Sequence, residues 1–545
     1  MPQTPAVPVI PRPVSVEPIE AAPFTLAPDA RISVAGCGAD AVARSLAAAL
    51  AGDCGRHPAI VDEPPAYGDF AIIIAEGEAP DGHSAEGYSV TVTSEGVRIG
   101  ADTEAGAFLG VQTVRQLIPV SCGADPLTIP AVSIRDHPRY AYRGAMLDVA
   151  RHFFTVEEIE RFIDAIVPLK LNHLHLHLSD DQGWRIDIVS WPNLARHGGS
   201  TGSDGSRGGY YTQDDYRRLV AYAGEHHITI VPEIDMPGHT NAALASYPQL
   251  NPSGIAPALY TGSKVGFSTL DADSMTTYEF IDDVIREVSS LTPGPYLHIG
   301  GDECLSTPPE QFLRFIGRAS QVAASHGKTL IGWHEMGASD RLPAGTIGQY
   351  WDYLAPRGDA AEDTLSFVRQ GGSVIMSPAD VSYMDIVYED GDRLGQDWAD
   401  GPTTIRDSYV WDPARIVPGL GDAHILGVEA PVWTETLATI DEVESMAFPR
   451  IAAVAEVAWS APPADTAEID SVRDFAEFAP RLAALGERWD QAGTVFRRVP
   501  GVPWVSGVAE EPEQDDRDGL QGDSDAEHDA AGPARVGEPL RAEQR

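Results

Sequence analysis

The segment Tyr296-Leu-His-Ile-Gly-Gly-Asp-Glu303 contains the clearest indication of the fold. Its first four residues are mostly apolar, which is typical of a buried strand, and two glycines follow directly. Glycine permits an unusual turn or a close backbone approach that other residues resist. The segment therefore predicts a strand whose carboxyl end carries two acidic residues, Asp302 and Glu303.

Seven other apolar segments along the chain also predict strands. The eight predicted strands cover residues 142–150, 173–178, 228–234, 296–299, 329–333, 346–350, 373–376 and 425–428. Helices are predicted between them, for example after Thr155, which begins a capping box with Glu158. Strands that alternate with helices predict an α/β protein with a parallel (β/α)8 TIM barrel, and an open doubly wound sheet is the alternative.

Polar and aromatic residues follow many of the predicted strands, which favours the barrel over the open sheet. These residues are Arg151, Asp180, Asp181, Asp235, Asp302, Glu303, Trp333, His334, Trp351, Asp352, Trp433, Thr434 and Glu435. Barrel enzymes place their chemistry at the carboxyl ends of the strands. We therefore expect the functional site at that end of the barrel.

The chain is predicted to divide into four regions. Residues 1–21 are rich in proline and predict a flexible leader, and residues 22–135 predict a small α+β accessory domain without catalytic groups. Residues 136–505 would form the catalytic barrel. Residues 506–545 predict a disordered acidic tail, because residues 510–529 hold ten acids and one arginine.

The charge of the chain excludes several classes of partner. In 545 residues, 81 acidic side chains exceed 38 basic ones, which gives a net charge of −43. Such a surface repels phosphate backbones and anionic lipids, so we expect neither nucleic-acid nor membrane binding. No secretory signal is visible, and four cysteines do not make a disulfide scaffold. A cytoplasmic location is expected, or secretion if the start site is misassigned.

Asp302 and Glu303 are the strongest candidates for catalytic groups. Adjacent strand residues point to opposite faces, so the two carboxyl groups should have different surroundings. Two acids in different surroundings can hold different protonation states at one pH. That combination suits glycosidic bond cleavage, in which one acid protonates the leaving oxygen while another group stabilises the sugar cation.

Aromatic and polar side chains near the predicted strand ends suit the binding of a sugar. Indole rings pack on the apolar faces of sugars, and the candidates are Trp184, Trp333, Trp351, Trp398 and Trp433. Arg151, Asp180, His239 and Glu435 would bind its hydroxyl groups. A buried ion pair is the alternative interpretation of Arg151 and Asp180.

Three histidines support a competing hypothesis of a metal-dependent hydrolase. His173, His175 and His177 alternate and so share one face of a strand, which is a plausible ligand pattern with His239, His298 or Asp302. They run along the strand interior rather than gathering at its end. Hydrogen-bonded core histidines are therefore the preferred interpretation, and no metal is predicted.

Four motifs in order resemble glycoside hydrolase family 20, the β-N-acetylhexosaminidases. They are AMLDVARHFF (145–154), LHLHLSDDQGW (174–184), PEIDMPGH (232–239) and HIGGDE (298–303). The resemblance runs from residue 136 to residue 504 and more weakly through the N-terminal segment. It implies substrate-assisted hydrolysis with retention, in which the 2-acetamido oxygen of the substrate attacks C1 and forms an oxazolinium ion.

The resemblance also implies a role for each matching residue. Glu303 would be the general acid and then the base, Asp302 would orient the acetamido group, and Tyr383 would bond its oxygen. The remaining implied substrate-binding residues form the pocket walls (Trp333, Trp351, Trp433), hold the hydroxyl groups (Arg151, Asp385, Glu435) and support Glu303 (Asp180, His239). No metal and no cofactor are implied.

The expected partners are oligosaccharides that end in N-acetylhexosamine, in the catabolism of chitin oligosaccharides or other glycans. Release of a terminal disaccharide and a sugar-binding protein without catalysis are the alternatives within this reading. The sequence leaves the choice between the gluco and galacto sugars, and the oligomeric state, open.

Overall fold

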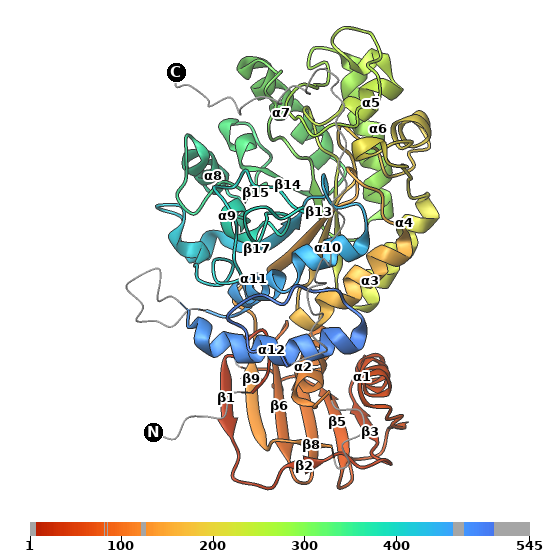
Figure 1. Cartoon of the computed structure of the whole chain (residues 1–545). Coiled ribbons are helices and arrows are strands. Elements are labelled where there is room, and N and C mark those ends of the chain that lie inside the picture. The colour runs from red at the N-terminus through yellow and green to blue at the C-terminus, as the bar shows by residue number, and fades with distance from the viewer. Residues whose placement is uncertain (1–6, 81, 84, 121–126, 462–472, 506–545) are drawn as a thin grey trace, which may run out of the picture. The chain divides into compact units, whose positions relative to one another are not determined.

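Eight parallel strands form a closed barrel in the computed structural model, which describes residues 7–80, 82–83, 85–120, 127–461 and 473–505 (Figure 1). The strands follow one another in chain order. They are β10 (Tyr142–Asp148), β11 (His173–His177), β12 (Thr229–Glu233), β13 (Tyr296–His298), β14 (Thr329–Trp333), β15 (Ile347–Tyr350), β16 (Val374–Met376) and β17 (Ile425–Val432). The predicted TIM barrel is confirmed, and the open sheet is wrong because β10 pairs with β17.

The helix that follows the first barrel strand buries one apolar face. In α3 (Val156–Ile166), Thr155 and Glu158 form the predicted capping box, and Ile159, Phe162 and Ile163 are fully buried. The other helices of the barrel domain are α4 (Gln213–Glu225), α5 (Asn241–Ser246), α6 (Met275–Leu291), α7 (Pro309–Ala324), α8 (Ala360–Arg369), α9 (Ala379–Ser382), α10 (Ile440–Ala447), α11 (Arg450–Trp459) and α12 (Phe475–Ala492). No helix among the described residues is long and apolar enough to cross a membrane.

The N-terminal region is an α+β domain built on a seven-stranded mixed sheet. In sheet order its strands are β1 (Ser15–Pro18), β9 (Val132–Asp136), β6 (Tyr88–Thr93), β7 (Gly96–Ala101), β5 (Asp69–Ile74), β3 (Ile32–Ala35) and β4 (Ile60–Val61). Helices α1 (Ala39–Cys54) and α2 (Glu104–Leu117) pack on it, and β2 (Phe24–Thr25) pairs with β8 (Thr128–Ile129). Strands β6 and β7 pair as antiparallel neighbours, with Val90 opposite Ile99.

A buried polar cluster joins this domain to the barrel. Lys170, which is fully buried, donates to Asp136 Oδ2 at 2.9 Å and to the Tyr88 hydroxyl at 2.7 Å. The indole of Trp459 donates to the other oxygen of Asp136 at 3.0 Å. Buried charges need such partners, because an unpaired one would cost several kcal/mol.

Residues 7–21 differ from the predicted flexible leader. Residues 15–18 form the edge strand β1, in which Val16 pairs with Ile134 of β9. Ile10 is fully buried, and its backbone bonds the side chain of Gln116 at 2.8 and 2.7 Å. Apolar residues stand between the prolines, and an extended segment at a sheet edge tolerates proline. A count of prolines does not reveal this arrangement. The predicted acidic tail, residues 506–545, lies outside the described residues.

Candidate active site

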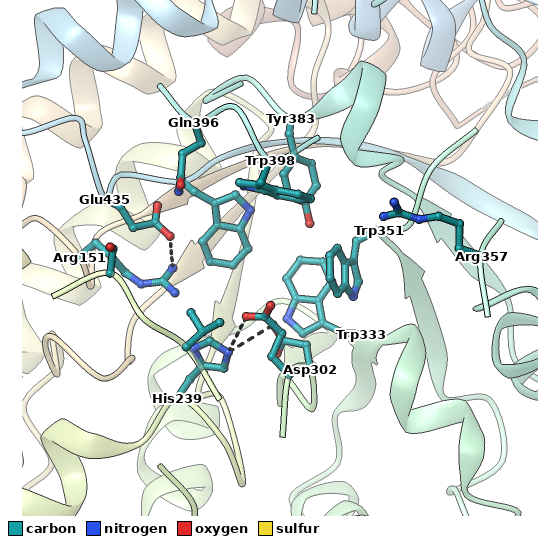
Figure 2. Close-up of a pocket in the computed structure, with 14 residues that line it drawn as sticks. Arg151, His239, Asp302, Trp333, Trp351, Arg357, Tyr383, Gln396, Trp398 and Glu435 are labelled. Carbon is teal, nitrogen blue, oxygen red and sulfur yellow. Dashed lines mark ion pairs between the residues drawn. The ribbon is translucent and has the colours of Figure 1, made fainter. Parts of the chain in front are cut away.

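A cavity of about 330 Å³ opens at the carboxyl ends of the barrel strands (Figure 2). Its lining comes from segments that follow seven of the eight strands and are far apart in the sequence. The lining residues are Arg151, His239, Ser263, Val265, Asp302, Glu303, Trp333, Trp351, Arg357, Tyr383, Gln396, Trp398, Trp433 and Glu435. The structure thus brings together nine of the eleven predicted site residues, while Asp180 and Asp385 lie behind the lining.

The two glycines after β13 aim the acidic pair into the cavity. Gly300 and Gly301 have φ of +65° and +103°, a backbone conformation that residues with a Cβ adopt only with strain. A Cβ on Gly300 would lie 1.6 Å from Asp235 Oδ1, the atom that accepts the Gly301 N–H at 3.0 Å. Glu303 itself has φ of +45°, so the turn holds this residue in a strained conformation.

Replacing Gly300 by alanine is expected to lower the free energy of unfolding by about 2–5 kcal/mol, because overpacking and the positive φ both add cost. Urea denaturation followed by intrinsic fluorescence measures this change. Gly224→Ala is the control, because a Cβ there meets open space. Equal urea midpoints for Gly300→Ala and wild type would contradict the argument.

His239 contacts both acidic side chains. Its Nε2 lies 3.4 Å from Glu303 Oε2 and 3.6 Å from Asp302 Oδ2. Burial alone would lower the pKa of His239, but the carboxylates of Asp180 and Asp302 raise it well above its usual value. The site therefore holds an imidazolium against two carboxyl groups.

Asp180 supports His239 from below the cavity. Its Oδ1 lies 3.1 Å from His239 Nδ1, and its Oδ2 lies 2.9 Å from an Arg151 nitrogen. Although burial raises the pKa of a carboxyl group, Arg151 and His239 hold that of Asp180 well below its usual value. The buried ion pair of Arg151 and Asp180 exists, and Arg151 also lines the cavity.

Asp302 retains a proton more firmly than an ordinary aspartate. Burial raises its pKa to about 7, the charges of Glu335 and Glu303 add to this effect, and His239 opposes it. Only 8% of the residue is exposed, whereas a third of the Glu303 side chain is exposed. The two neighbouring acids therefore have different surroundings, as the sequence predicts.

Aromatic rings form the walls of the cavity (Figure 2). The ring centres of Trp333 and Trp433 lie 5.9 Å apart, and that of Tyr383 lies 6.3 Å from that of Trp433. Trp398 meets Trp351 at 6.2 Å and stands edge-on, at an interplanar angle of 77°. Such a box of rings offers apolar faces to a sugar.

Trp184 does not belong to this set of rings. It is buried, its indole donates to the Ile186 carbonyl at 2.7 Å, and it packs on Phe280 in the core. Of the five candidate tryptophans, Trp184 is therefore a core residue, whereas the other four line the cavity.

Arg151 and Glu435 lie across the cavity from Trp351 (Figure 2). Arg151 lies 3.7 Å from Glu435 and 4.9 Å from the centre of the Trp433 ring. Asp385 accepts the Trp433 backbone N–H at 3.2 Å, and burial together with the charge of Glu435 raises its pKa to about 8.

Several buried oxygens at this site have no hydrogen-bond donor among the described residues. They are Asp302 Oδ1, Asp385 Oδ2 and Glu435 Oε2. Buried acceptors are almost always paired in folded proteins. Three unpaired acceptors around one cavity indicate a site for a ligand rich in hydrogen-bond donors, such as a carbohydrate.

Sequence reasoning missed five residues at or beside the cavity. Ser263, Val265, Arg357 and Gln396 line it from long connections that carry no motif. Glu335 follows β14 directly, so the pattern of polar residues after strands could have found it. Both of its carboxylate oxygens accept from the Trp351 indole, at 3.1 and 2.9 Å, and burial raises its pKa to about 7.

The three histidines of β11 are engaged inside the barrel. His173 stacks on Tyr142 at 4.0 Å, His175 Nδ1 lies 3.0 Å from Glu429, and both ring nitrogens of His177 contact carboxylates. Burial would lower the pKa values of His175 and His177, but Glu429, Glu233 and Asp180 raise them. These contacts place His175 and His177 in a buried network of ion pairs with carboxylates.

Known proteins of one family match most of the chain. The model of the glycosyl hydrolase family 20 catalytic domain matches residues 140–312 and 305–462, and that of domain 2 of the same family matches residues 6–137. A β-N-acetylhexosaminidase from Cellulomonas fimi is 41% identical over 506 residues, which cover 92% of this chain and 98% of that protein.

Two solved structures are similar to this chain over most of its length. One is the family 20 β-N-acetylhexosaminidase of Streptomyces coelicolor A3(2), with 45% identity, a TM-score of 0.86, and coverage of 92% of this chain and 99% of that one. The other is a mutant Streptomyces plicatus β-hexosaminidase in complex with its product GlcNAc, with 45% identity, a TM-score of 0.86, and coverage of 92% and 98%.

Proposed function

This chain belongs to glycosyl hydrolase family 20 and is a glycoside hydrolase, and we propose that it is an exo-acting β-N-acetylhexosaminidase. It would remove terminal, non-reducing N-acetyl-D-hexosamine from oligosaccharides during carbohydrate catabolism. The observation that carries the proposal is the ring-walled cavity of about 330 Å³ that bears Asp302 and Glu303. A cavity of this size suits a single sugar unit, and the names of the relatives support the choice of sugar.

The placement of the acidic pair supports substrate-assisted chemistry. Asp302 and Glu303 are adjacent, and both lie against His239. One carboxylate oxygen of each acid and one imidazole nitrogen of His239 lie within 4.8 Å of one another. Two carboxylates on one wall do not flank a sugar from both faces, as a double displacement with an enzyme nucleophile requires. The attacking group would therefore come from the substrate, as the oxygen of its 2-acetamido group.

The proposed reaction has two steps. In the first, Glu303 donates its proton to the glycosidic oxygen, the bond from C1 to that oxygen breaks, and the acetamido oxygen bonds C1 to form an oxazolinium ion. Asp302 accepts the acetamido N–H and stabilises the positive charge, and the Tyr383 hydroxyl donates to the acetamido oxygen. In the second, Glu303 takes a proton from water, the water oxygen bonds C1, and the bond from C1 to the acetamido oxygen breaks, which restores the acetamido group and the β configuration.

The remaining predicted residues would bind and orient the sugar. Trp333, Trp351 and Trp433 would enclose the acetamido group and the sugar face, and Arg151, Asp385 and Glu435 would bind the hydroxyl groups. The unpaired oxygens of Asp385 and Glu435 suit this role, because each can accept a sugar hydroxyl. Asp180 and His239 would hold Glu303 in position through the contacts described above.

Hydrolysis of 4-nitrophenyl N-acetyl-β-D-glucosaminide and its galacto counterpart tests the proposal. We expect turnover of at least one of them, competitive inhibition by a thiazoline analogue of the oxazolinium ion, and no turnover of the matching β-glucoside, which lacks the acetamido group. The analogue should bind far more tightly than the substrate because it resembles the reaction intermediate. Equal turnover of the plain glucoside would overturn the substrate-assisted mechanism.

A further inference from the structure

Glu233, the last residue of β12, lies behind the cavity and holds four side chains at once. It is fully buried. Its Oε1 accepts the Trp333 indole N–H at 3.0 Å and lies 2.9 Å from His298 Nδ1. Its Oε2 contacts His177 Nδ1 and lies 3.1 Å from His175 Nε2. No carboxylate of the cavity lining contacts as many side chains as that of Glu233.

Two routes lead from Glu233 to the reaction site. The short one is the Trp333 indole, which forms a wall of the cavity. The long one runs through charged groups of alternating sign. In it, His177 Nε2 lies 2.7 Å from Asp180 Oδ2, Asp180 Oδ1 lies 3.1 Å from His239 Nδ1, and His239 Nε2 lies 3.4 Å from Glu303 Oε2.

We propose that Glu233 is a positioning residue that fixes both the indole wall of the sugar pocket and the His177–Asp180–His239 chain behind Glu303. This inference rests on the proposed function, because its kinetic effect is read in glycoside hydrolysis. The single carboxylate would fix the position of the Trp333 indole, which contacts the sugar, relative to Glu303, which transfers the proton. A displacement of about 1 Å at such a distance from the chemistry can cost about 10²-fold in rate.

The charges along the chain support this role. Burial would raise the pKa of Glu233, but His177, His298 and His175 hold it well below its usual value. Burial would lower the pKa of His177, but Glu233 and Asp180 raise it well above its usual value. Other titratable groups also face the side chains that run from Glu233 to His239. They are Arg151, Asp181, Asp235, Asp302, Glu303, His298 and, beyond His175, Glu429.

Two substitutions separate the two routes. Glu233→Gln keeps an oxygen that can accept from Trp333 but places an amide opposite His177, so we expect kcat to fall about 10–100-fold with KM within about threefold of wild type. Trp333→Phe replaces the indole by a smaller ring without an N–H and leaves the carboxylate of Glu233 in place. For this variant we expect KM to rise about tenfold and kcat to change less. A merely structural role would lower the active fraction in both variants without this split.

Glu429→Gln is the matched control. Glu429 is another fully buried barrel carboxylate that contacts a histidine, His175, but it bonds neither Asp180 nor Trp333. Its substitution should reduce thermal stability comparably and leave kcat and KM within about twofold of wild type. An effect on kcat as large as that of Glu233→Gln would overturn the assignment of a specific role to Glu233.

A second readout does not depend on turnover. NMR of histidine-labelled protein, with His177 assigned from its loss in His177→Gln, follows the imidazole charge. We expect His177 to lose its proton at a lower pH in Glu233→Gln than in the wild type, because the variant lacks one of the two carboxylates that raise the His177 pKa against the effect of burial. A wild type that turns over no N-acetylhexosaminide would refute the proposed function, whereas an unchanged His177 titration in Glu233→Gln would refute this inference. If Glu233→Gln does not fold, His177→Gln takes its place in the kinetic comparison, with the same expected loss of kcat.

Discussion

Glu303→Gln is expected to lower kcat/KM for hydrolysis of N,N′-diacetylchitobiose by about 10²–10⁴-fold, the usual contribution of a general acid–base group. In the proposed mechanism, this variant would lack the group that protonates the leaving sugar and then activates water. Glutamine has nearly the same shape and the side chain is a third exposed, so the fold should be retained. The effect is measured from initial rates of release of N-acetylglucosamine.

The effect of Glu303→Gln should depend on the leaving group of the substrate. 4-Nitrophenolate leaves without a proton, so Glu303→Gln should slow the first step much less with the aryl glycoside than with chitobiose. Added azide should then accelerate turnover of the aryl glycoside and yield the β-glycosyl azide, because azide needs no general base. Glu310→Gln, on the exposed start of α7, is the control and should retain wild-type rates. A loss below tenfold with chitobiose would remove Glu303 from its assigned role.

Asp302→Asn is expected to lower kcat by about 10²–10³-fold, the usual cost of removing one electrostatic contact to a developing charge. The amide retains the size of the carboxyl group but cannot neutralise an oxazolinium ion. It also presents an N–H where the acetamido N–H needs an acceptor. Affinity for the thiazoline analogue should fall in parallel with kcat, whereas the affinity for the product sugar should change less.

The same substitution should make the protein more stable at neutral and alkaline pH. Asp302 has a pKa of about 7 in the folded chain against an ordinary value of 3.8, mainly because it is buried. Between these values the unfolded chain releases the proton while the folded chain retains it, so the free energy of unfolding falls as the pH rises. Asparagine does not titrate and escapes this loss.

The difference in Tm between Asp302→Asn and wild type should therefore grow from pH 4 to pH 7 and then level off. Calorimetry at fixed ionic strength across this range measures it. A Tm difference that is flat with pH would show that the charge of Asp302 imposes no cost on the folded state. Together, lower turnover and higher stability are the combination expected when a buried charge is kept for function.

The sequence predicted the barrel because its signal is repeated. Each predicted strand is short and apolar, and polar or aromatic residues follow many of them, so an error at one strand does not change the interpretation. The boundaries agree within a few residues for most strands, and β17 extends to Val432 rather than ending at residue 428. The β10–β17 pairing that closes the sheet has no local signal, since it joins residues far apart in the chain.

The prediction of the site was good where residues follow strands and poor where they do not. Arg357 and Gln396 belong to long connections, whose path depends on packing rather than on periodicity. Glu233 lies within a quoted motif, but alternation along β12 does not reveal which groups face it across the barrel. Residues 7–21 were misjudged from their prolines, because the partners Gln116 and Ile134 lie more than 100 residues away.

The Lys170–Asp136 cluster has a consequence for protein engineering. It places one half of a buried ion pair on each side of the junction, with Tyr88 and Trp459 completing it. A chimaera that exchanges the N-terminal domain for that of a relative must therefore carry compatible residues at all four positions, or it buries an unmatched charge. The N-terminal domain therefore cannot be exchanged independently of the barrel residues that it contacts.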